Sequence, residues 1–314
     1  MTKSNEQQAL LIAGPTASGK SAVALELAMA TGGAIINADS MQVYRDLRVL
    51  TARPPDADLR RAEHHLYGYV DAAESCSVGR WLADMERVLK AVRRRGKRPV
   101  IVGGTGLYFK ALTEGLAPLP DIPADIRRYW RSRARDEGAA VLHRVLQQRD
   151  PALAARLRDT DPQRLARALE VLEATGKSLL WWQSQPPQPP LLPLRPDMAF
   201  VLAPERSVLY GRIDRRFGRM LSEGALDEVA KLAARRLDPA LPLMKALGVP
   251  ELMAYLAGKM TRATAVEKAG TLSRRYAKRQ MTWARSNMIS WNRVNGQEKE
   301  RIAEIIFNKI QNPG

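Results

Sequence analysis

A glycine-flanked loop near the amino end constrains this chain more than any other segment. Residues 14–21 read GPTASGKS, which completes the pattern G-x-x-x-x-G-K-S between an apolar run and a helical run. Loops of this kind direct backbone N–H groups at phosphate oxygens, and the helix that follows places the positive end of its dipole there. The run, the loop and the helix occur in the order that the motif requires. We therefore expect this segment to hold a diphosphate or a triphosphate.

The expected phosphate site combines backbone donors, a positive charge and a metal ligand. Glycines at both ends of the loop let its backbone N–H groups point inward. Lys20 adds the charge, and the Ser21 hydroxyl is the expected ligand of Mg²⁺, the cofactor that the motif predicts. The expected diphosphate-binding residues of the loop are Gly14, Pro15, Thr16, Ala17, Ser18, Gly19, Lys20 and Ser21.

The hydrophobic pattern predicts a parallel sheet with helices on its faces. Short apolar runs typical of buried strands occur at residues 9–14, 33–39, 98–104 and 197–203. Amphipathic helical patterns alternate with these runs, which indicates β-α-β units. We therefore predict an α/β fold, a P-loop NTPase-like parallel sheet flanked by helices.

This alternation stops between residues 116 and 190. The segment contains Arg-rich helical patterns and no convincing strand, and a proline-rich stretch follows it. Proline cannot continue a helix or a central strand. We predict that residues 116–190 form an inserted all-helical domain, and that residues 1–115 and 191–314 form the catalytic core. After residue 204 the pattern is helical, which predicts a helical C-terminal region.

The charge balance points to a polyanionic partner. Fifty Lys and Arg residues against thirty-three Asp and Glu residues give a net charge of +17. Such an excess suits RNA, although an Arg-rich surface that only aids solubility remains open. The single cysteine, Cys76, excludes an internal disulfide and fits a reducing cytoplasm. Neither a signal sequence nor a membrane span is expected, and we expect a monomer.

Polar residues follow the second and third apolar runs. Asp39 ends the second run, and the carboxyl ends of parallel strands border the ligand crevice of an open sheet. Its carboxylate suits proton abstraction, water-mediated binding of Mg²⁺ or capping of the next turn. Gln42 has an amide able to pair with adenine, or merely to face solvent. In GGTGLY (103–108), the glycines allow either close approach to a ligand or a tight turn.

An acidic residue of the Walker B type is missing from the third apolar run, which ends in VIVGGTG. The sequence also shows no obvious base that would orient a hydrolytic water. An NTPase or an ordinary kinase is therefore not the natural expectation for this loop.

Several blocks of the sequence resemble bacterial tRNA dimethylallyltransferases, which are tRNA isopentenyltransferases of the IPP transferase family. They include GPTASGKS, INADSMQVYRDLRVLTARP, VGGTGLYFKALTEGL and RRYAKRQMTWAR, and they extend from about residue 9 to residue 293. The resemblance implies transfer of a dimethylallyl group from dimethylallyl diphosphate to N6 of adenosine 37, in tRNAs that read codons beginning with U. The resemblance thus implies that the loop binds the diphosphate, which is the leaving group of the reaction.

The same resemblance implies roles for individual residues. Asp39 is similar to the family's general base, while Thr16 and Thr105 would place the diphosphate and the acceptor. Arginines would stabilise negative charge on the departing diphosphate. The implied catalytic residues are Asp39, Thr16, Lys20, Thr105 and Arg212, and Arg216 joins the diphosphate-binding set.

The implied RNA contacts come from the Asp39 loop, the helical insertion and the basic C-terminal helices. Taken singly, an arginine in these segments fits a solvated surface charge better than a phosphate contact; the cluster of arginines is what favours phosphate contacts. The implied tRNA-binding residues are Asp39, Ser40, Met41, Gln42, Thr105, Arg127, Arg128, Gln163, Arg164, Leu165, Ala166, Arg167, Arg275 and Arg279.

One block departs from the family pattern. Where the family often has Gly-Tyr-Arg/Lys-Glu, this chain has Val249 and Pro250 between Gly248 and Glu251. RNA contacts by those two side chains are therefore not expected. The Cys/His extension of eukaryotic relatives is not present, so a zinc finger is not expected.

Three other functions compete with this interpretation. An adenylate isopentenyltransferase would prenylate free AMP, ADP or ATP, but the charge and the insertion favour RNA. A P-loop small-molecule kinase would use Asp39 as its base, although no kinase-like lid pattern is present. A non-catalytic RNA-binding protein would leave the phosphate loop without a purpose.

Overall fold

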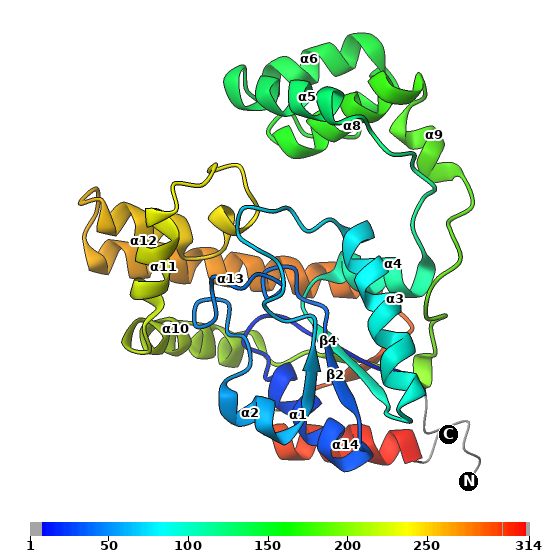
Figure 1. Cartoon of the computed structure of the whole chain (residues 1–314), viewed down its shortest axis with the longest axis vertical. Coiled ribbons are helices and arrows are strands. Elements are labelled where there is room, and N and C mark those ends of the chain that lie inside the picture. Colours follow the sequence, from blue (N-terminus) through cyan, green and yellow to red (C-terminus); the bar gives the residue numbers. More distant parts are fainter. Residues whose placement is uncertain (1–7, 297, 312–314) are drawn as a thin grey trace. The chain divides into compact units, whose positions relative to one another are not determined.

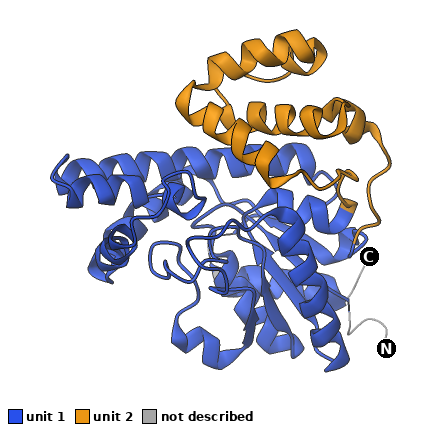
Figure 2. Cartoon of the chain, turned by 45° about the horizontal axis from the view of Figure 1, so that its top comes forward, with its two compact units in different colours: residues 1–113, 191–314 blue, residues 114–190 orange. Residues whose placement is uncertain are grey.

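The computed structural model describes residues 8–296 and 298–311. It divides the chain into two compact units (Figure 2). Unit 1 runs to Thr113 and resumes at Leu191, and unit 2 is Glu114–Pro190. The sequence pattern had put the start of the insertion at residue 116.

Unit 1 is built on a six-stranded parallel sheet with the order β3-β2-β4-β1-β5-β6. Figure 1 labels β2 and β4, two neighbouring strands of this sheet. The predicted α/β fold is therefore confirmed. The strands are β1 (Leu10–Ala13), β2 (Ala34–Asn37), β3 (Glu63–His65), β4 (Pro99–Gly103), β5 (Ala199–Leu202) and β6 (Asn292–Val294).

The two edge strands, β3 and β6, were not among the apolar runs. The predicted helical C-terminal region is confirmed, and it also contains one short strand that the pattern did not indicate, because β6 pairs with β5. The sequences of β3 and β6 are EHH and NRV, and each strand is only three residues long. A sheet edge is half solvated, so these strands need no continuous apolar run that a sequence pattern would reveal.

Helices cover both faces of the sheet because successive strand residues point to opposite faces. Leu10 and Ile12 of β1 belong to the core with α1 (Lys20–Thr31) and α14 (Lys299–Gln311). Leu11 and Ala13 belong to the core with α3 (Val78–Arg94) and α4 (Gly106–Glu114). The remaining helices of unit 1 are α2 (Asp56–Arg61), α10 (Arg206–Ser222), α11 (Ala225–Ala234), α12 (Val249–Leu256) and α13 (Arg262–Asn287), with short 3-10 helices at Pro196–Met198 and Leu243–Lys245.

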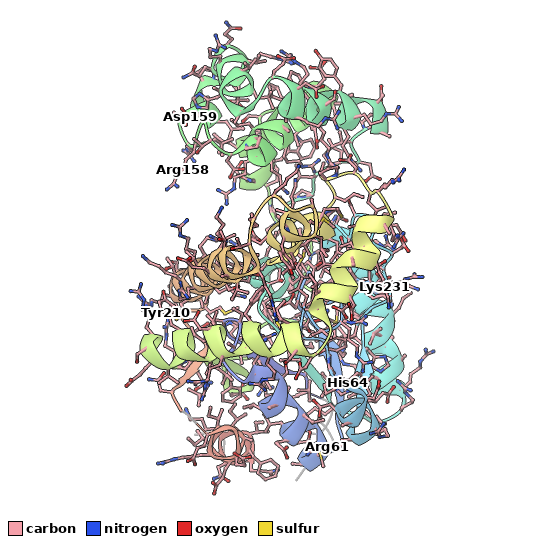
Figure 3. The ribbon with its side chains drawn as sticks, turned by 90° about the vertical axis from the view of Figure 1, so that its left-hand side faces the viewer. Arg61, His64, Arg158, Asp159, Tyr210 and Lys231 are labelled. Atoms are coloured by element: carbon pink, nitrogen blue, oxygen red, sulfur yellow. The ribbon has the colours of Figure 1, made fainter. Side chains whose placement is uncertain are left out.

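Unit 2 contains helices and connecting loops, with no strand among its described residues. Trp130, Leu142 and Leu169 are buried in its own hydrophobic core. Exposed charges such as Arg158 and Asp159 project from the segment between α7 (Pro151–Ala154) and α8 (Pro162–Thr175) (Figure 3). Its helices are α5 (Ala124–Asp136), α6 (Ala139–Arg149), α7 (Pro151–Ala154), α8 (Pro162–Thr175) and α9 (Leu179–Ser184).

No helix in the described part of the chain combines the length and the apolar character needed to cross a membrane.

Candidate active site

The phosphate loop joins β1 to α1 and has a backbone shaped to present N–H groups. Ala17 and Gly19 have φ angles of 62° and 89°, in the left-handed region. Alternation of such residues with right-handed ones turns successive N–H groups toward one side. Helix α1 begins at Lys20 with neither a side-chain cap nor an acidic residue in its first turn. Its first N–H groups are therefore available to an anion.

Strain and burial in this loop are typical of functional sites. A left-handed conformation costs about 1–2 kcal/mol for alanine, and the surrounding structure holds Ala17 there. The Ser18 hydroxyl is buried, and no hydrogen-bond partner for it is found among the described residues. A Cβ on Gly14 would lie 2.8 Å from that hydroxyl oxygen, so Gly14 makes room for Ser18.

Two cations and a carboxylate meet at the mouth of the loop. Lys20 Nζ donates to the Pro15 carbonyl at 3.2 Å, and Arg216 Nη1 of α10 lies 3.4 Å from Thr16 Oγ1. Asp39 is close enough to raise the pKa of both cations, against the lowering effect of their burial. Burial lowers the pKa of Lys20 to about 8. The fold thus brings together residues from three distant segments of the sequence.

Arg216, rather than Arg212, makes the contact with Thr16. Arg212 lies one turn earlier on the same helix and is partly buried. The catalytic role of Arg212 stays a prediction.

Asp39 lies in a turn directly after β2. Its N–H donates to Asn37 Oδ1 at 2.9 Å, and its Oδ1 accepts the Met41 N–H at 3.0 Å. One carboxylate oxygen therefore caps the turn. The other, Oδ2, accepts no hydrogen bond from the described residues, so the capping and proton-accepting roles are compatible within one side chain.

Thr105, in the loop after β4, holds the Asp39 turn. Its Oγ1 accepts the Ser40 N–H at 2.9 Å, and its own N–H donates to the Ala38 carbonyl at 3.2 Å. A Cβ on Gly103 would lie 2.0 Å from that carbonyl oxygen. Glycine is thus required here because the loops after β2 and β4 touch.

Gln42 makes hydrogen bonds that its predicted adenine contact would have to break. Its Nε2 donates to the carbonyls of Thr51 and Ala52, at 2.9 and 3.2 Å. These bonds fold the loop that follows Asp39. Only the Oε1 atom of Gln42 remains for a base, because both amide hydrogens are engaged.

Glu228 of α11 supports the same loop and carries no signal in the sequence. Its carboxylate accepts the N–H groups of Arg48, Val49 and Leu50 at 2.8–3.1 Å. These partners are separated from it by about 180 residues, so no local pattern reveals the contact.

Helix α13 fills the space that the glycines of GGTGLY leave. A Cβ on Gly104 would lie 2.3 Å from Gln280 Nε2, and one on Gly106 would lie 2.2 Å from the Trp283 ring. These two glycines therefore admit side chains of α13. The predicted alternatives were ligand approach and a tight turn, and neither included this helix.

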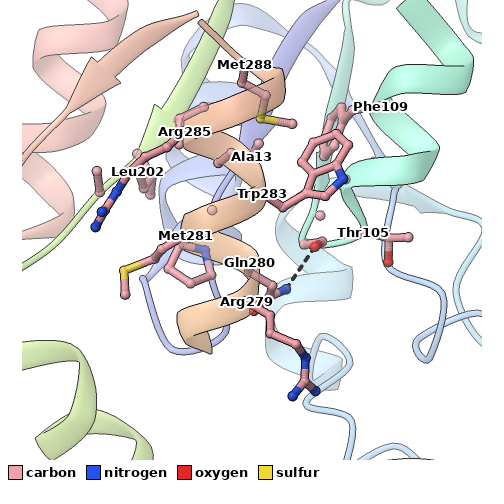
Figure 4. Close-up of a pocket in the computed structure, with 18 of the residues that line it drawn as sticks. Ala13, Thr105, Phe109, Leu202, Arg279, Gln280, Met281, Trp283, Arg285 and Met288 are labelled. Carbon is pink, nitrogen blue, oxygen red and sulfur yellow. Dashed lines mark hydrogen bonds between the residues drawn. The ribbon is translucent and has the colours of Figure 1, made fainter. Parts of the chain in front are cut away.

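An apolar cavity of about 330 Å³ lies beside the phosphate loop (Figure 4). It is bounded by the ends of β1, β4 and β5 and by α13. Arg279, Arg285 and Arg293 also line it. Its apolar lining includes Phe109, Val201, Leu202, Met281, Trp283 and Met288.

The predicted RNA-binding residues of unit 2 separate into two groups. Leu165 and Ala166 are buried in the core of unit 2, so side-chain contacts from these two residues with RNA are ruled out. They occupy the inward side of α8, whereas Gln163 and Arg164 are exposed. Arg167 is partly exposed and pairs with the buried Glu170 at 3.2 Å.

The remaining predicted RNA-binding arginines differ in exposure. Arg128, Arg275 and Arg279 are exposed, whereas Arg127 donates to the Ile122 carbonyl at 3.2 Å. Arg279 also lies over the Tyr276 ring at 5.6 Å. Burial and the charge of Asp39 raise the pKa of Tyr276, which places this ring near the site.

A metal site made of side chains alone is not evident. Among the described residues, no group of three or more His, Cys, Asp and Glu side chains gathers to hold an ion. Ser21 is exposed on the first turn of α1. A hydroxyl beside a phosphate cradle, with Asp39 nearby, suits Mg²⁺, which commonly binds through substrate phosphates and few protein ligands.

Comparison with known proteins assigns the family. A family model described as IPP transferase matches residues 42–287. The chain belongs to the IPP transferase family. The tRNA dimethylallyltransferase of Bradyrhizobium sp. strain BTAi1 is 55% identical over 92% of this chain and 94% of the relative. That of Nitrobacter hamburgensis is 53% identical over 93% and 92%. The resemblance seen in the sequence is confirmed.

Solved structures of IPP transferases share the fold. The tRNA isopentenylpyrophosphate transferase of Bacillus halodurans is 33% identical, with a TM-score of 0.69 over 97% of each chain. A eukaryotic dimethylallyltransferase acting on tRNA is 26% identical, with a TM-score of 0.77 over 94% of this chain and 75% of that one.

The structure accommodates the departure from the family pattern at Val249 and Pro250. Val249 is fully buried in the core of unit 1. Pro250 lies in the first turn of α12, where proline's missing N–H costs nothing.

Proposed function

We propose that this chain transfers the dimethylallyl group of dimethylallyl diphosphate to N6 of adenosine 37 in tRNAs reading codons that begin with U. The products are N6-(dimethylallyl)adenosine and diphosphate. The observation that carries the proposal is the convergence of a phosphate loop, two cations and one carboxylate in an IPP transferase.

The loop and its cations stabilise the leaving group. When the allylic C–O bond breaks, negative charge develops on the diphosphate. Backbone N–H groups of the loop, Lys20 and Arg216 lie together at this loop, so they would stabilise that charge with little reorganisation. Ser21 would hold Mg²⁺, which would neutralise part of the diphosphate charge.

Asp39 is the proposed general base for the acceptor atom, N6 of adenosine 37. The N6 lone pair is delocalised into the adenine ring, so N6 attacks well only as it loses a proton. Oδ2 of Asp39 accepts that proton as the N6–carbon bond forms, while Oδ1 keeps the turn in place. Adenosine 37 must leave its stack to reach this position.

The apolar cavity next to the loop suits the five-carbon chain of the donor. Its aromatic and aliphatic walls exclude water from an allylic carbon that acquires positive charge. Exclusion of water matters because water would otherwise capture that carbon.

Exposed arginines and the net charge of +17 suit the phosphates of the anticodon arm. Gln163, Arg164 and Arg167 of α8 and Arg275 and Arg279 of α13 are the proposed contacts. We place the enzyme in the cytoplasm, where its tRNA acceptor is found. We also propose that it acts as a monomer.

One assay tests this function against its competitors. The purified chain receives dimethylallyl diphosphate and Mg²⁺ together with unmodified tRNA, with AMP, or with ATP and candidate acceptors. We expect a mass gain of one dimethylallyl group on tRNA alone. Prenylated AMP would make it an adenylate isopentenyltransferase, and consumption of ATP without prenylation would make it a kinase.

A further inference from the structure

Gln280 connects the phosphate loop to the loop after β4. Its Oε1 accepts the Thr16 N–H at 2.9 Å. Its Nε2 donates to the Gly104 carbonyl at 2.8 Å, and Figure 4 marks this second bond by a dashed line. The three residues are far apart in sequence. A single side chain of α13 therefore bridges the two loops.

The orientation of the amide is determined by its partners. The Thr16 N–H is only a donor and the Gly104 carbonyl only an acceptor, so a primary amide satisfies both in one orientation. A carboxylate at this position could accept from Thr16 but could not donate to Gly104. An aliphatic side chain could do neither.

The bridge continues to the acceptor side. Thr105 follows Gly104 directly, and its hydroxyl accepts the N–H of Ser40, the residue after Asp39. The Thr105 N–H also donates to Ala38. Gln280 is thus linked through two adjacent residues to the turn that carries the carboxylate.

The shape of the site requires this contact. A Cβ on Gly104 would lie 2.3 Å from Gln280 Nε2, so the loop has a glycine where the amide enters. The next turn of α13 places Trp283 against Gly106 in the same way. Helix α13 is therefore locked to this loop at two points.

We propose that Gln280 is a positioning residue that sets the distance between the diphosphate loop and the Asp39 turn. This inference rests on the proposed function. Transfer requires the allylic carbon and N6 to approach within near-attack distance, and small displacements of bound reactants slow such steps strongly. Gln280 also lines the apolar cavity, but both polar atoms of its amide are engaged by Thr16 and Gly104, so it acts through these two residues.

The test compares Gln280→Met and Gln280→Glu with the unmodified chain. Methionine keeps the unbranched length but makes neither bond; glutamate keeps only the bond to Thr16. We expect kcat to fall about 10- to 100-fold in both, with KM for tRNA changed less than about threefold. Thr282→Ala, at an exposed position of the same helix, is the matched control.

A purely structural role gives a different result. It would lower the thermal midpoint and leave kcat per folded molecule unchanged, and that outcome in Gln280→Met would overturn the inference. Near-normal kcat in Gln280→Glu would also overturn it, because one bond would then suffice. Glutamate preserves size and polarity, so it serves even where methionine impairs folding.

A double-mutant cycle tests the connection to the acceptor side. Thr105→Val removes the hydroxyl that holds Ser40. If Gln280 acts through this residue, the combined loss of kcat is smaller than the product of the two single losses. Multiplicative losses would show that the two residues act independently.

Binding of inorganic pyrophosphate separates this inference from the proposed function. We expect Gln280→Met to weaken pyrophosphate binding about 3- to 10-fold by calorimetry, because the loop loses an anchor. Unchanged affinity would mean that Gln280 does not hold the loop. Absence of prenyl transfer by the unmodified chain would instead refute the proposed function and leave the binding comparison valid.

Discussion

Asp39 performs a structural and a chemical task with different oxygens. Oδ1 accepts the Met41 N–H at 3.0 Å and shapes the turn. The proposed reaction uses Oδ2 to accept a proton. At the residue scale, function therefore depends on how many hydrogen bonds each polar atom already makes.

Asp39→Asn isolates the proton-accepting role. Asparagine keeps an oxygen for the Met41 N–H but cannot act as a base, so kcat should fall about 100- to 10,000-fold. The dissociation constant for tRNA should stay within about twofold, since the turn is preserved. Single-turnover kinetics and filter binding measure both. Near-normal turnover of this variant would disprove the base assignment.

The pKa of Lys20 predicts a pH limit on donor capture. Burial lowers this pKa to about 8, so the lysine is charged below pH 8 and neutral above it. Because the neutral amine attracts diphosphate weakly, kcat/KM for dimethylallyl diphosphate should be constant below about pH 8 and fall above it. Rates between pH 6.5 and 9.5 test this prediction.

Lys20→Arg provides the control for that profile. A guanidinium stays charged throughout this range, so the fall above pH 8 should disappear even where the overall rate is lower. A fall of kcat/KM above pH 8 that persists in Lys20→Arg would show that the titration of another group causes it.

At the scale of elements, the two sides of α8 have different tasks. Leu165 and Ala166 face the core of unit 2, while Arg164 is exposed and pairs with Asp161 at 3.4 Å. Arg167 neutralises Glu170, which is buried. Removing Arg167 would thus disturb packing as well as RNA affinity, whereas removing Arg164 would not.

Arg164→Ala therefore tests the RNA face of α8 cleanly. We expect weaker tRNA binding and a plot of log affinity against log salt that is shallower by about one unit, as for one lost phosphate contact. Titrations at several salt concentrations measure both. Arg95→Ala, which removes an exposed arginine beside Glu63 of β3, should change neither. If the slope of log affinity against log salt is unchanged in Arg164→Ala, other residues must contact the tRNA phosphates.

At the scale of the whole molecule, the last helix stabilises the first. Ile306 of α14 is fully buried in the core that α14 shares with α1 and the sheet. Since α1 begins at the phosphate loop, the end of the chain supports the site from behind. This contact lies outside every motif of the sequence.

Ile306→Ala should destabilise the protein without altering its chemistry. Loss of a fully buried isoleucine costs about 2–5 kcal/mol and lowers the midpoint of thermal unfolding. Ile289→Ala, at a side chain that is 79% exposed, should change stability by less than about 0.5 kcal/mol. Denaturant titration compares them. Equal stabilities would show that α14 does not support the core.

The sequence alone determined the features that depend on neighbours in the chain. The phosphate loop, the four inner strands and the helical insertion follow from local spacing, because each buries or exposes residues at a fixed period. Asp39 was predicted as a site residue because it follows an apolar run typical of a strand, and parallel strands end at one edge; the structure places it two residues after the end of β2. The family followed from the order of these blocks, and its fold is confirmed.

Only the tertiary structure decided the contacts between distant segments. The contacts of Arg216 with Thr16, of Glu228 with the loop after Asp39 and of Gln280 with the two loops each join residues at least 170 positions apart. The inward position of Leu165 and Ala166 was likewise settled by the core of unit 2. Such contacts leave no periodic signal, because they depend on which surfaces meet once the sheet and its helices have packed.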